Sequence, residues 1–389
     1  MKLAYICTEK LPSPAVKGGA IQMMIDGVAP LLCKTHELTI FSISDEILPE
    51  RERKNNIDYI RFPRVNYRTR VAEELKNHQF DVIHVFNRPK NILIYKESSP
   101  KSQFVLSLHN DMFSEGKISE EDGKKAIEAA TLITTVSHYI KNQVTRRFPE
   151  AETKIHVVYS GVNLTSYPPV WTAEGQLIRK QYRRKYNLDN KKVILFVGRL
   201  SKTKGPHLLI KAMKHIIKQH EDVVLVIAGG KWFSDNRVNS YVRYLYNLAK
   251  PLGKHVVFTK FIPPEEIPNI FLMADIFVCS SQWNEPLARV HYEAMAAGIP
   301  LITTNRGGNG EIVEDENNGI LVDHYDHPLA FVDRIDYLVK KPGYAQWLAY
   351  NGRKFVEENF DFTHVAKRLE SVYIKAYESE NKLETLLDS

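Results

Sequence analysis

Two stretches of the 389-residue sequence place charged side chains where they could bind a phosphorylated sugar. The first is Phe196–Gly205, in which Gly198 follows a short apolar run and precedes Arg199 and Lys204. An arginine offers phosphate oxygens a planar fork, a lysine offers a point charge, and the start of a helix adds unpaired N–H groups. We expect this stretch to bind a diphosphate. Taken alone, it also fits two solvated surface cations.

The second stretch runs from Glu285 to Pro300 and carries two carboxylates, Glu285 and Glu293. Pro286 is typical of the first turn of a helix and Gly298 of the residue after its end, so we expect a helix between them. Glu285 then lies at the helix entrance. Glu293, about two turns into the helix, leans back toward a ligand bound there.

The N–H groups of Leu287 to Arg289 would be unpaired at that helix start and would face the same ligand. A phosphate on these amides, with hydroxyl-bearing rings on the two glutamates, describes a nucleotide sugar. The simpler alternative for Glu293 is a solvated helix glutamate. We expect the neighbouring His291 and Tyr292 to pack the helix rather than to act on a substrate.

Both stretches lie in a sequence that alternates short apolar runs with longer helical patterns. This alternation predicts parallel sheets with helices on both faces, joined by right-handed crossovers. The predicted strands are Leu3–Cys7, Leu38–Phe41, Val82–Val85, Phe104–Leu108, Leu132–Val136, Ile155–Val158, Val193–Val197, Val223–Ile227, Val256–Phe258, Ile276–Cys279 and Leu301–Thr303. The predicted helices include Gly205–Gln219, Ser240–Lys250, Phe331–Lys340 and Thr363–Tyr377.

The alternation pauses at Tyr167–Gly175, where two prolines and a glycine are typical of a linker. We therefore expect two doubly wound α/β domains, residues 1–168 and 169–359. In such domains ligands bind outside the carboxyl ends of the strands. Two facing domains would then hold one ligand in the cleft between them.

The composition is that of a globular protein, with 43% hydrophobic residues, 25% charged residues and a formal net charge of +7. These values exclude disordered, collagen-like and disulfide-dense chains. The densest basic run, Arg179–Lys185, has no nucleic-acid reader module around it. We expect it to form a solvated helix face, with no nucleic-acid partner. A mild positive field suits an enzyme whose substrate carries phosphates.

No apolar run approaches the roughly 20 residues of a membrane-spanning helix. The run Leu3–Cys7 is also too short for the apolar region of a signal peptide. We therefore expect a cytoplasmic protein without a transmembrane segment. Cys7, Cys33 and Cys279 lie far apart in sequence and are expected to be buried thiols rather than a disulfide or a metal site.

The order of these motifs resembles the retaining GT-B glycosyltransferases of family GT4 along nearly the whole chain. The resemblance rests on Gly198-Arg199-Leu200 with Lys204-Gly205, on Glu285 with Glu293-Ala294-Met295-Ala296 and Gly298-Ile299-Pro300, and on Gly18-Gly19, His109-Asn110, Ser160–Asn163, Gly307–Ile312 and Asn318–Val322. Details such as Cys279–Trp283 are similar to the spore coat protein SA type from endospore-forming bacteria. The resemblance implies a GT-B fold, two Rossmann-like domains facing each other across a cleft, with a terminal helix, residues 360–380, completing the first.

For the donor, the resemblance implies that Arg199 and Lys204 clamp the diphosphate next to Gly198. It assigns Glu293 to the ribose hydroxyls and Glu285 to the hydroxyls of the transferred sugar. The remaining donor contacts would be the amides of Leu287 and Ala288 on the phosphates and the backbone around Ile262 at the base.

The resemblance also implies a contribution from the N-terminal half. Gly18 and Gly19 would let a loop approach the diphosphate closely, and His109 would face the donor sugar beside the reacting carbon. Taken alone, His109 fits an ordinary strand-end histidine equally well.

The chain departs from the family pattern at two places. Leu287-Ala288 stands where the family usually has Phe-Gly, and an alanine keeps its N–H for a phosphate only if its φ is negative. The glycine loop of the family often reads Gly-Gly-x-Glu, whereas Ile21-Gln22 follows Gly18-Gly19-Ala20 here. The second departure concerns contacts on the acceptor side.

The function that the resemblance implies is transfer of a hexose or an N-acetylhexosamine from a nucleotide diphosphate sugar, with UDP as the expected carrier, and with retention at the anomeric carbon. Retention by double displacement needs a carboxylate close to that carbon. Because the resemblance assigns Glu285 to sugar hydroxyls, we expect a front-face path in which the leaving phosphate deprotonates the acceptor. No Asp-x-Asp metal motif is present, so no cofactor is expected to be essential, and Mg²⁺ would enter only on the nucleotide.

The expected partners are the donor and an acceptor that the sequence does not identify: a glycan, a protein or a small molecule. The spore coat resemblance implies a role in coat or cell-surface glycan formation, in the mother-cell cytoplasm or the coat, with coat proteins as further partners. Two alternatives remain. One is an epimerase or phosphorylase on the same fold. The other is a spore-coat structural or carbohydrate-binding protein that has lost catalysis.

Overall fold

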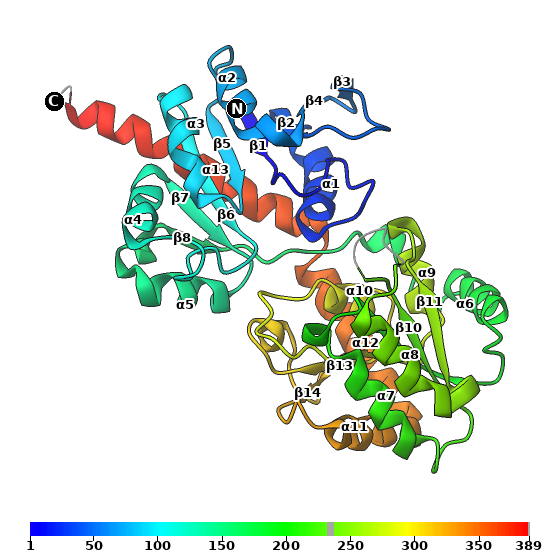
Figure 1. Cartoon of the computed structure of the whole chain (residues 1–389). Helices are drawn as coiled ribbons and strands as arrows, with labels where there is room; N and C mark the ends of the chain where they lie inside the picture. Colours follow the sequence, from blue (N-terminus) through cyan, green and yellow to red (C-terminus); the bar gives the residue numbers. More distant parts are fainter. Residues whose placement is uncertain (232–236, 388–389) are drawn as a thin grey trace. The chain divides into compact units, whose positions relative to one another are not determined.

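The computed structural model describes residues 1–231 and 237–387, with side chains up to residue 379. The chain divides into two compact units (Figure 1). Unit 1 comprises Met1–Ser160 and the segment from Phe362 onward, and unit 2 comprises Gly161–Asp361. Each unit is described by itself.

The sheet of unit 1 has the strand order β3-β4-β2-β1-β5-β6-β7-β8. All neighbouring strands are parallel except the edge strand β3, which is antiparallel to β4. The strands are β1 (Lys2–Ile6), β2 (Glu37–Ile43), β3 (Arg51–Lys54), β4 (Ile57–Phe62), β5 (Val82–Phe86), β6 (Gln103–Leu108), β7 (Leu132–Thr135) and β8 (Ile155–Val157).

Helices cover this sheet because its strands are apolar on both faces. Val82–Phe86, for example, is buried at every residue. The helices are α1 (Ala20–Leu32), α2 (Tyr67–Leu75), α3 (Ile92–Ser98), α4 (Glu120–Ala129), α5 (His138–Arg147) and α13 (Phe362–Leu387).

The terminal helix α13 joins unit 1 through a buried polar triad and a close helix crossing. The Tyr373 hydroxyl lies 2.7 Å from the Tyr5 hydroxyl and 2.7 Å from Nδ1 of His84. A Cβ at Gly27 of α1 would lie 2.2 Å from the Phe362 ring, so only glycine admits this crossing. The last helix of the chain thereby completes the core of the first unit.

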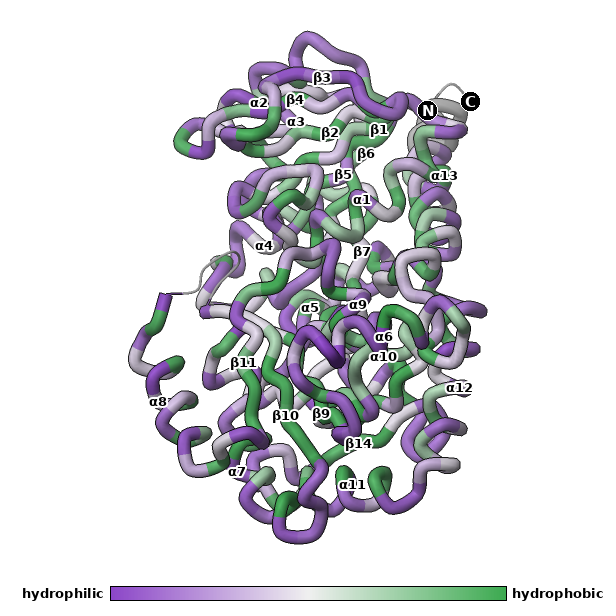
Figure 2. Tube along the Cα trace, turned by 90° about the vertical axis from the view of Figure 1, so that its right-hand side faces the viewer, coloured by the Kyte–Doolittle hydropathy of each residue, from purple (hydrophilic) through white to green (hydrophobic). Residues whose placement is uncertain are grey.

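The sheet of unit 2 is parallel throughout, in the order β11-β10-β9-β12-β13-β14. Figure 2 shows β9 and β10 as hydrophobic stretches. The strands are β9 (Lys192–Val197), β10 (Val223–Ala228), β11 (Val256–Lys260), β12 (Ile276–Cys279), β13 (Leu301–Thr304) and β14 (Ile320–Val322). The helices are α6 (Ala173–Lys185), α7 (Pro206–Ile216), α8 (Ser240–Ala249), α9 (Ile267–Leu272), α10 (Val290–Ala296), α11 (Pro328–Lys340) and α12 (Pro342–Asn359).

The unit boundary lies before the expected linker. Residues 161–168, expected in the first domain, belong to unit 2 because the Val162 N–H donates to the Phe360 carbonyl oxygen at 2.9 Å and Val162 forms a parallel bridge with Asp361. These pairings join this segment to the chain that follows α12.

The basic run Arg179–Lys185 corrects a second expectation, since it is not simply a solvated helix face. Arg179 and Arg183 of α6 each donate to the Asp275 carboxylate at 2.6 Å, and their side chains are 16% and 14% exposed. Arg179 also donates to the Leu272 and Ala274 carbonyl oxygens at the end of α9. Two charges of the run therefore hold α6 against α9.

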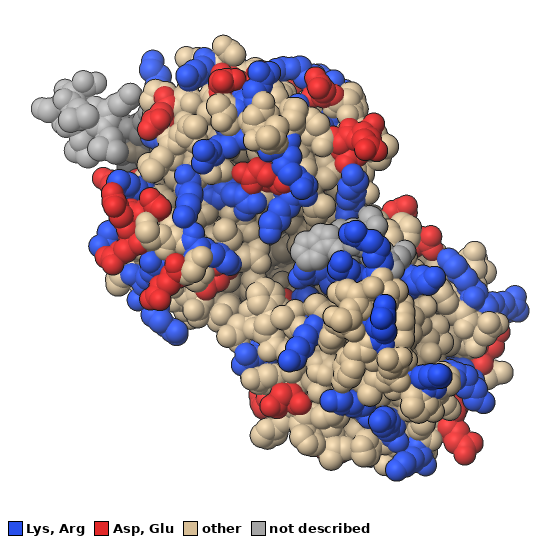
Figure 3. All heavy atoms as spheres, viewed as in Figure 1, with Lys and Arg blue, Asp and Glu red and all other residues tan. Residues whose placement is uncertain are grey.

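Charged side chains elsewhere on the surface do not gather in one patch of a single sign on the face shown. On the face shown in Figure 3, Lys and Arg lie over both units and are interspersed with Asp and Glu.

Cys7 and Cys279 are buried free thiols, whereas Cys33 is only half-buried. Within the described residues, no helix is long and apolar enough to cross a membrane.

Candidate functional site

The candidate site of unit 2 lies where β9 and β12 end. These strands are parallel neighbours, with Ile276 opposite Ile194, so the loops that follow them leave the same edge of the sheet. Gly198, Arg199 and a short turn over Lys202–Lys204 follow β9. The two stretches that the sequence selected for phosphate and sugar chemistry are therefore adjacent.

Backbone contacts fix these two loops to each other. Gly205 has φ +72°, and a Cβ there would lie 2.0 Å from the Ser280 carbonyl oxygen. The Ser280 hydroxyl donates to the Lys204 carbonyl oxygen at 3.1 Å, and the Gln282 N–H donates to that of Thr203 at 2.7 Å. Lys204 is thus presented from a turn that the chain after β12 holds in place.

Lys204 forms an ion pair with Glu285 across these loops. Its ammonium donates to Glu285 Oε1, to which the Ser281 hydroxyl also donates at 2.5 Å. The Glu285 side chain is 4% exposed and that of Lys204 21%. Burial by itself would raise the pKa of Glu285, but the charge of Lys204 and hydrogen bonds from Lys204, Ser281 and Trp283 bring it below its usual value. Glu285 is therefore an ionised, buried carboxylate.

A third loop supports the Glu285 backbone. A Cβ at Gly307, which has φ +61°, would lie 2.1 Å from the Glu285 carbonyl oxygen, and the Gly308 N–H donates to that oxygen at 2.7 Å. The Asn309 side-chain oxygen accepts the Ala288 N–H at 3.2 Å. The φ of Ala288 is negative, as expected, but its N–H is paired with Asn309 and not unpaired as the sequence predicted.

The helix after Glu285 begins later than expected. It starts at Val290 rather than near Pro286, which places Glu293 in its first turn instead of two turns in. The cause is tertiary: the Glu285 carbonyl oxygen accepts from the Gly308 N–H and the Ala288 N–H donates to Asn309, so neither group is available to an earlier helical turn. His291 and Tyr292 are fully buried, as expected of helix-packing residues.

Glu293 is buried in an ion pair of its own. The Arg289 guanidinium donates to Glu293 Oε1 at 3.2 Å, and the two side chains are 12% and 6% exposed. The same guanidinium donates to the Gly161 carbonyl oxygen at 3.1 Å. Glu293 is therefore not a solvated helix glutamate.

The remaining donor residues of unit 2 lie at neighbouring strand ends. Arg199 is half-buried; burial lowers the pKa of its guanidinium and the nearby Glu285 charge opposes that effect. Gly198 lies against β10, because a Cβ at Gly229 would be 2.0 Å from the Gly198 carbonyl oxygen. Ile262 is buried just after β11, and Leu287 is half-buried.

Gly18, Gly19 and His109 lie in unit 1, at the ends of other strands. Gly18 and Gly19 have φ of 74° and 105° and precede α1. His109 follows β6; its ring nitrogen Nε2 lies 3.1 Å from the Ser107 hydroxyl, and its N–H donates to the Asn87 side chain at 2.9 Å. Their expected contribution to the donor site stays a prediction.

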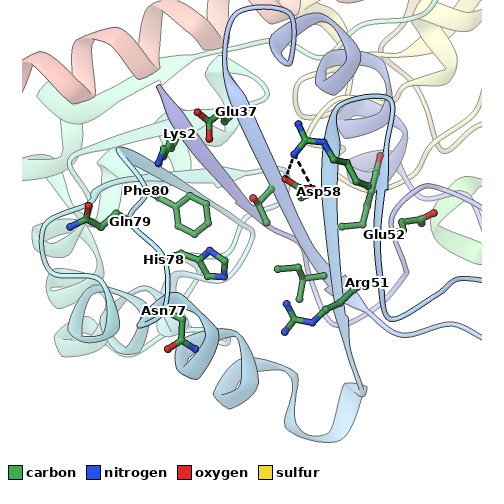
Figure 4. Close-up of a pocket in the computed structure, with 13 residues that line it drawn as sticks. Lys2, Glu37, Arg51, Glu52, Asp58, Asn77, His78, Gln79 and Phe80 are labelled. Carbon is green, nitrogen blue, oxygen red and sulfur yellow. Dashed lines mark hydrogen bonds and ion pairs between the residues drawn. The ribbon is translucent and has the colours of Figure 1, made fainter.

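A hollow of about 640 Å³ lies at the opposite, amino ends of the strands of unit 1 (Figure 4). Lys2, Glu37 and the segment before β5 line it together with β3 and β4. Its arginines are engaged: Arg51 with Glu74 at 2.7 Å and Arg53 with Asp58 at 3.2 Å. Unlike the site after β12, this hollow is not built from several loops that are bonded to one another.

Four contributions to the site were not predicted from the sequence: the side chains of Ser281, Arg289 and Asn309, and the close backbone approach at Gly307. Gly307 and Asn309 lie in a segment already noted as family-like, and their glycine and amide character was the available signal. For Ser281 and Arg289 the available signal was spacing, because each pairs with a glutamate four residues further along the chain, Glu285 and Glu293. Among the described residues, no three His, Cys, Asp or Glu side chains group as a metal site.

Comparison with known proteins agrees along the whole chain. Residues 178–355 match the family model described as glycosyl transferases group 1, and residues 25–166 match that of glycosyltransferase family 4. YtcC of Bacillus subtilis (strain 168) is 60% identical over 382 residues, which cover 98% of this chain and 94% of that protein. Spore coat protein SA of the same organism is 47% identical, covering 96% and 100%.

Among solved structures, Alr3699/HepE of Anabaena, determined in complex with UDP, has a TM-score of 0.79 at 21% identity and covers 96% of this chain and 99% of that one. This likeness shows the two-domain GT-B fold. The fold class expected from the sequence is confirmed, as is the resemblance to glycosyltransferases of family 4.

Proposed function

The chain belongs to the glycosyl transferases of group 1, and we propose that it moves a hexose or an N-acetylhexosamine from a UDP-linked donor to an acceptor with retention at the anomeric carbon. The observation that carries this proposal is the buried pair Lys204–Glu285 beside Arg199, held at the carboxyl ends of adjacent strands. This is the position at which doubly wound sheets bind ligands.

Arg199 and Lys204 bind the donor diphosphate. Because Glu285 balances the charge of Lys204, the three side chains together carry one net positive charge. This charge attracts the negatively charged diphosphate. Charged groups fixed before the reaction stabilise a leaving diphosphate without reorganising, and losing one such group typically costs about 10²–10³ in rate. The amides near Leu287 and Ala288 bind its phosphate oxygens, that of Ala288 in place of its hydrogen bond to Asn309.

Glu285 binds hydroxyls of the transferred sugar through the acceptor positions that Lys204, Ser281 and Trp283 leave available. Glu293 binds the ribose hydroxyls, and the chain near Ile262 borders the base. UDP as the carrier is supported by the UDP complex of HepE.

Transfer follows a front-face path. The bond between the anomeric carbon and the diphosphate oxygen breaks, the acceptor oxygen bonds to the same face, and the departing phosphate oxygen takes the acceptor proton. No cofactor or divalent ion is required by this path. The product is a glycan in the spore coat or at the cell surface, in keeping with the likeness to spore coat protein SA.

The test is thermal unfolding and donor turnover with UDP, GDP, ADP and their sugars. A nucleotide at 100 times its Kd should add about 2.7 kcal/mol of stability. Lys204→Ala should lose this effect, whereas Lys202→Ala, an exposed lysine of the same turn, should keep it. If no nucleotide stabilises the wild type at millimolar concentration, the donor site is refuted and a non-catalytic coat or carbohydrate-binding role takes its place.

A further inference from the structure

Arg289 joins the carboxylate of Glu293 to a distant part of the backbone. One arm of its guanidinium, Nη2, donates to Glu293 Oε1 at 3.2 Å, and the other, Nη1, donates to the Gly161 carbonyl oxygen at 3.1 Å. Gly161 is 128 residues away in sequence and is the first residue of unit 2. Both terminal nitrogens of the guanidinium are therefore engaged in hydrogen bonds.

The surroundings of Glu293 leave it little freedom. Tyr167 is 4% exposed; burial raises the pKa of its hydroxyl far above the usual value, and the nearby charge of Glu293 raises it further. Glu293 itself lies in the first turn of α10, where its N–H donates to the Arg289 carbonyl oxygen at 3.3 Å. Arg289 supplies the positive charge that an ionised carboxylate at this depth needs.

This arrangement leaves hydrogen-bonding capacity on the carboxylate. An ionised carboxylate has about four acceptor positions; Arg289 uses one of them, on Oε1, and the Tyr167 hydroxyl hydrogen-bonds to the same carboxylate. The others can accept hydrogen bonds from a pair of neighbouring hydroxyls. A carboxylate already fixed in one orientation loses less entropy when it binds such a pair than a freely rotating one.

We propose that Arg289 is a positioning residue for the donor, which fixes Glu293 in the orientation that recognises the two ribose hydroxyls. This inference rests on the proposed function, in which Glu293 binds the ribose. Arg289 does not touch the reacting atoms, and its action on the donor passes through Glu293. A purely structural alternative exists, in which Arg289 only anchors the chain at Gly161.

The two roles are separated by a nucleotide that lacks the hydroxyls. The experiment measures the Kd of UDP, GDP and ADP and of their 2′,3′-dideoxy counterparts by calorimetry, on the full chain. In the wild type, the dideoxy form of the preferred nucleotide should bind about 10- to 100-fold more weakly, the range expected for hydrogen bonds to a charged group.

Arg289→Ala should weaken binding of the normal nucleotide by about tenfold and leave the dideoxy form within about twofold, so the preference for the ribose hydroxyls collapses. Arg289→Lys, which retains one charged hydrogen bond, should restore part of the preference. Equal loss for both nucleotides would overturn the positioning role and favour the structural one.

Arg353 of α12 is the matched control. Its side chain is 11% exposed, it donates to the Tyr167 carbonyl oxygen at 2.7 Å, and its ion pair is with Glu357. Arg353→Ala should leave the preference for the ribose hydroxyls unchanged. A wild type that binds no nucleotide refutes the proposed function. A wild type that binds both forms of the nucleotide equally well refutes the role of Glu293 and, with it, that of Arg289.

Discussion

The two units place an ion pair at the same point of their sheets but build it differently. In unit 1, Glu9 follows β1 and Arg88 follows the neighbouring β5, and they pair at 2.5 Å with side chains 24% and 21% exposed. In unit 2, Lys204 follows β9 and Glu285 follows the neighbouring β12, and Glu285 is only 4% exposed. Both pairs bridge adjacent strand ends of a doubly wound sheet.

The difference lies in what holds each pair. Around Glu285, Gly205 and Gly307 bring backbone within contact of backbone, and Ser281 adds a buried hydrogen bond. In the unit 1 pair, Glu9 accepts a hydrogen bond from the Asn91 amide at 3.1 Å, and Arg88 donates to the Asn87 carbonyl oxygen at 2.8 Å. The comparison teaches that the strand-end carboxylate of unit 2 is buried and braced by backbone, whereas that of unit 1 stays partly exposed.

The largest effect should come from removing Lys204. Lys204→Ala leaves Glu285 buried without its cation, so the free energy of unfolding should fall by about 3 kcal/mol, and turnover of the donor should fall by about 10²–10³. Chemical denaturation and a donor-turnover assay check the two parts.

A double variant separates charge from shape. Lys204→Met with Glu285→Gln removes both charges, so most of the lost stability should return while activity stays lost. If Lys204→Ala is as stable as the wild type, the pair is not buried in solution and the contrast between the units disappears.

The next effect concerns the glycine that lets the two loops meet. Gly205→Ala adds a Cβ at φ +72° and 2.0 Å from the Ser280 carbonyl oxygen, so the turn carrying Lys204 must move. The free energy of unfolding should fall by about 1–3 kcal/mol, with weaker nucleotide binding. Gly343→Ala is the control: nothing lies within 4 Å of its Cβ, and a helical position favours alanine. Equal effects of the two variants would contradict the close approach.

The pH dependence of stability should have opposite signs for one buried group in each unit. In unit 1, burial raises the pKa of Asp26 to about 6, so the folded state binds its proton more tightly than the unfolded state, and stability falls as pH rises from about 4 to 6. In unit 2, burial lowers the pKa of His291 to about 3, so the unfolded state binds the proton more tightly, and stability falls as pH drops below about 6.5.

Each group changes the free energy of unfolding by at most about 1.4 kcal/mol per pH unit. The measurement is the free energy of unfolding of Asp26→Asn and of His291→Asn, each relative to the wild type, between pH 4 and 7. The Asp26 variant should gain on the wild type as pH rises, and the His291 variant should gain as pH falls. Slopes of the same sign would contradict one of the two burial arguments.

The sequence predicted the parts of this comparison that depend on local pattern. Buried runs such as Val193–Val197 became strands because a strand covered on both faces is apolar throughout. The edge strand β3 was missed because its sequence, Arg-Glu-Arg-Lys, has no apolar signal; it pairs with β4 through a turn in which Asn55 and Asn56 have positive φ.

Tertiary contacts explain what local pattern could not supply. The start of α10 depends on Gly308 and Asn309, and the environment of Glu293 depends on Gly161. Residue types and spacing therefore identified which charges belong to the site. They did not show that Lys204 pairs with Glu285, because the two residues lie in loops that only the folded sheet brings close, whereas the pair Arg289–Glu293 has the i,i+4 spacing of a helix.

The smallest effect should come from the unit 1 pair. Arg88→Ala removes the partner of Glu9, but both side chains are partly exposed, so water can replace the lost contact. Partly exposed ion pairs are typically worth about 0–1 kcal/mol, and the free energy of unfolding should fall by no more than this. Chemical denaturation at 0.05 M and 0.5 M salt measures it, and Glu9→Gln is the control that removes the other charge with a similar shape. A loss as large as that of Lys204→Ala would mean that unit 1 also holds a fixed, buried charge pair, and the contrast drawn between the two units would then be wrong.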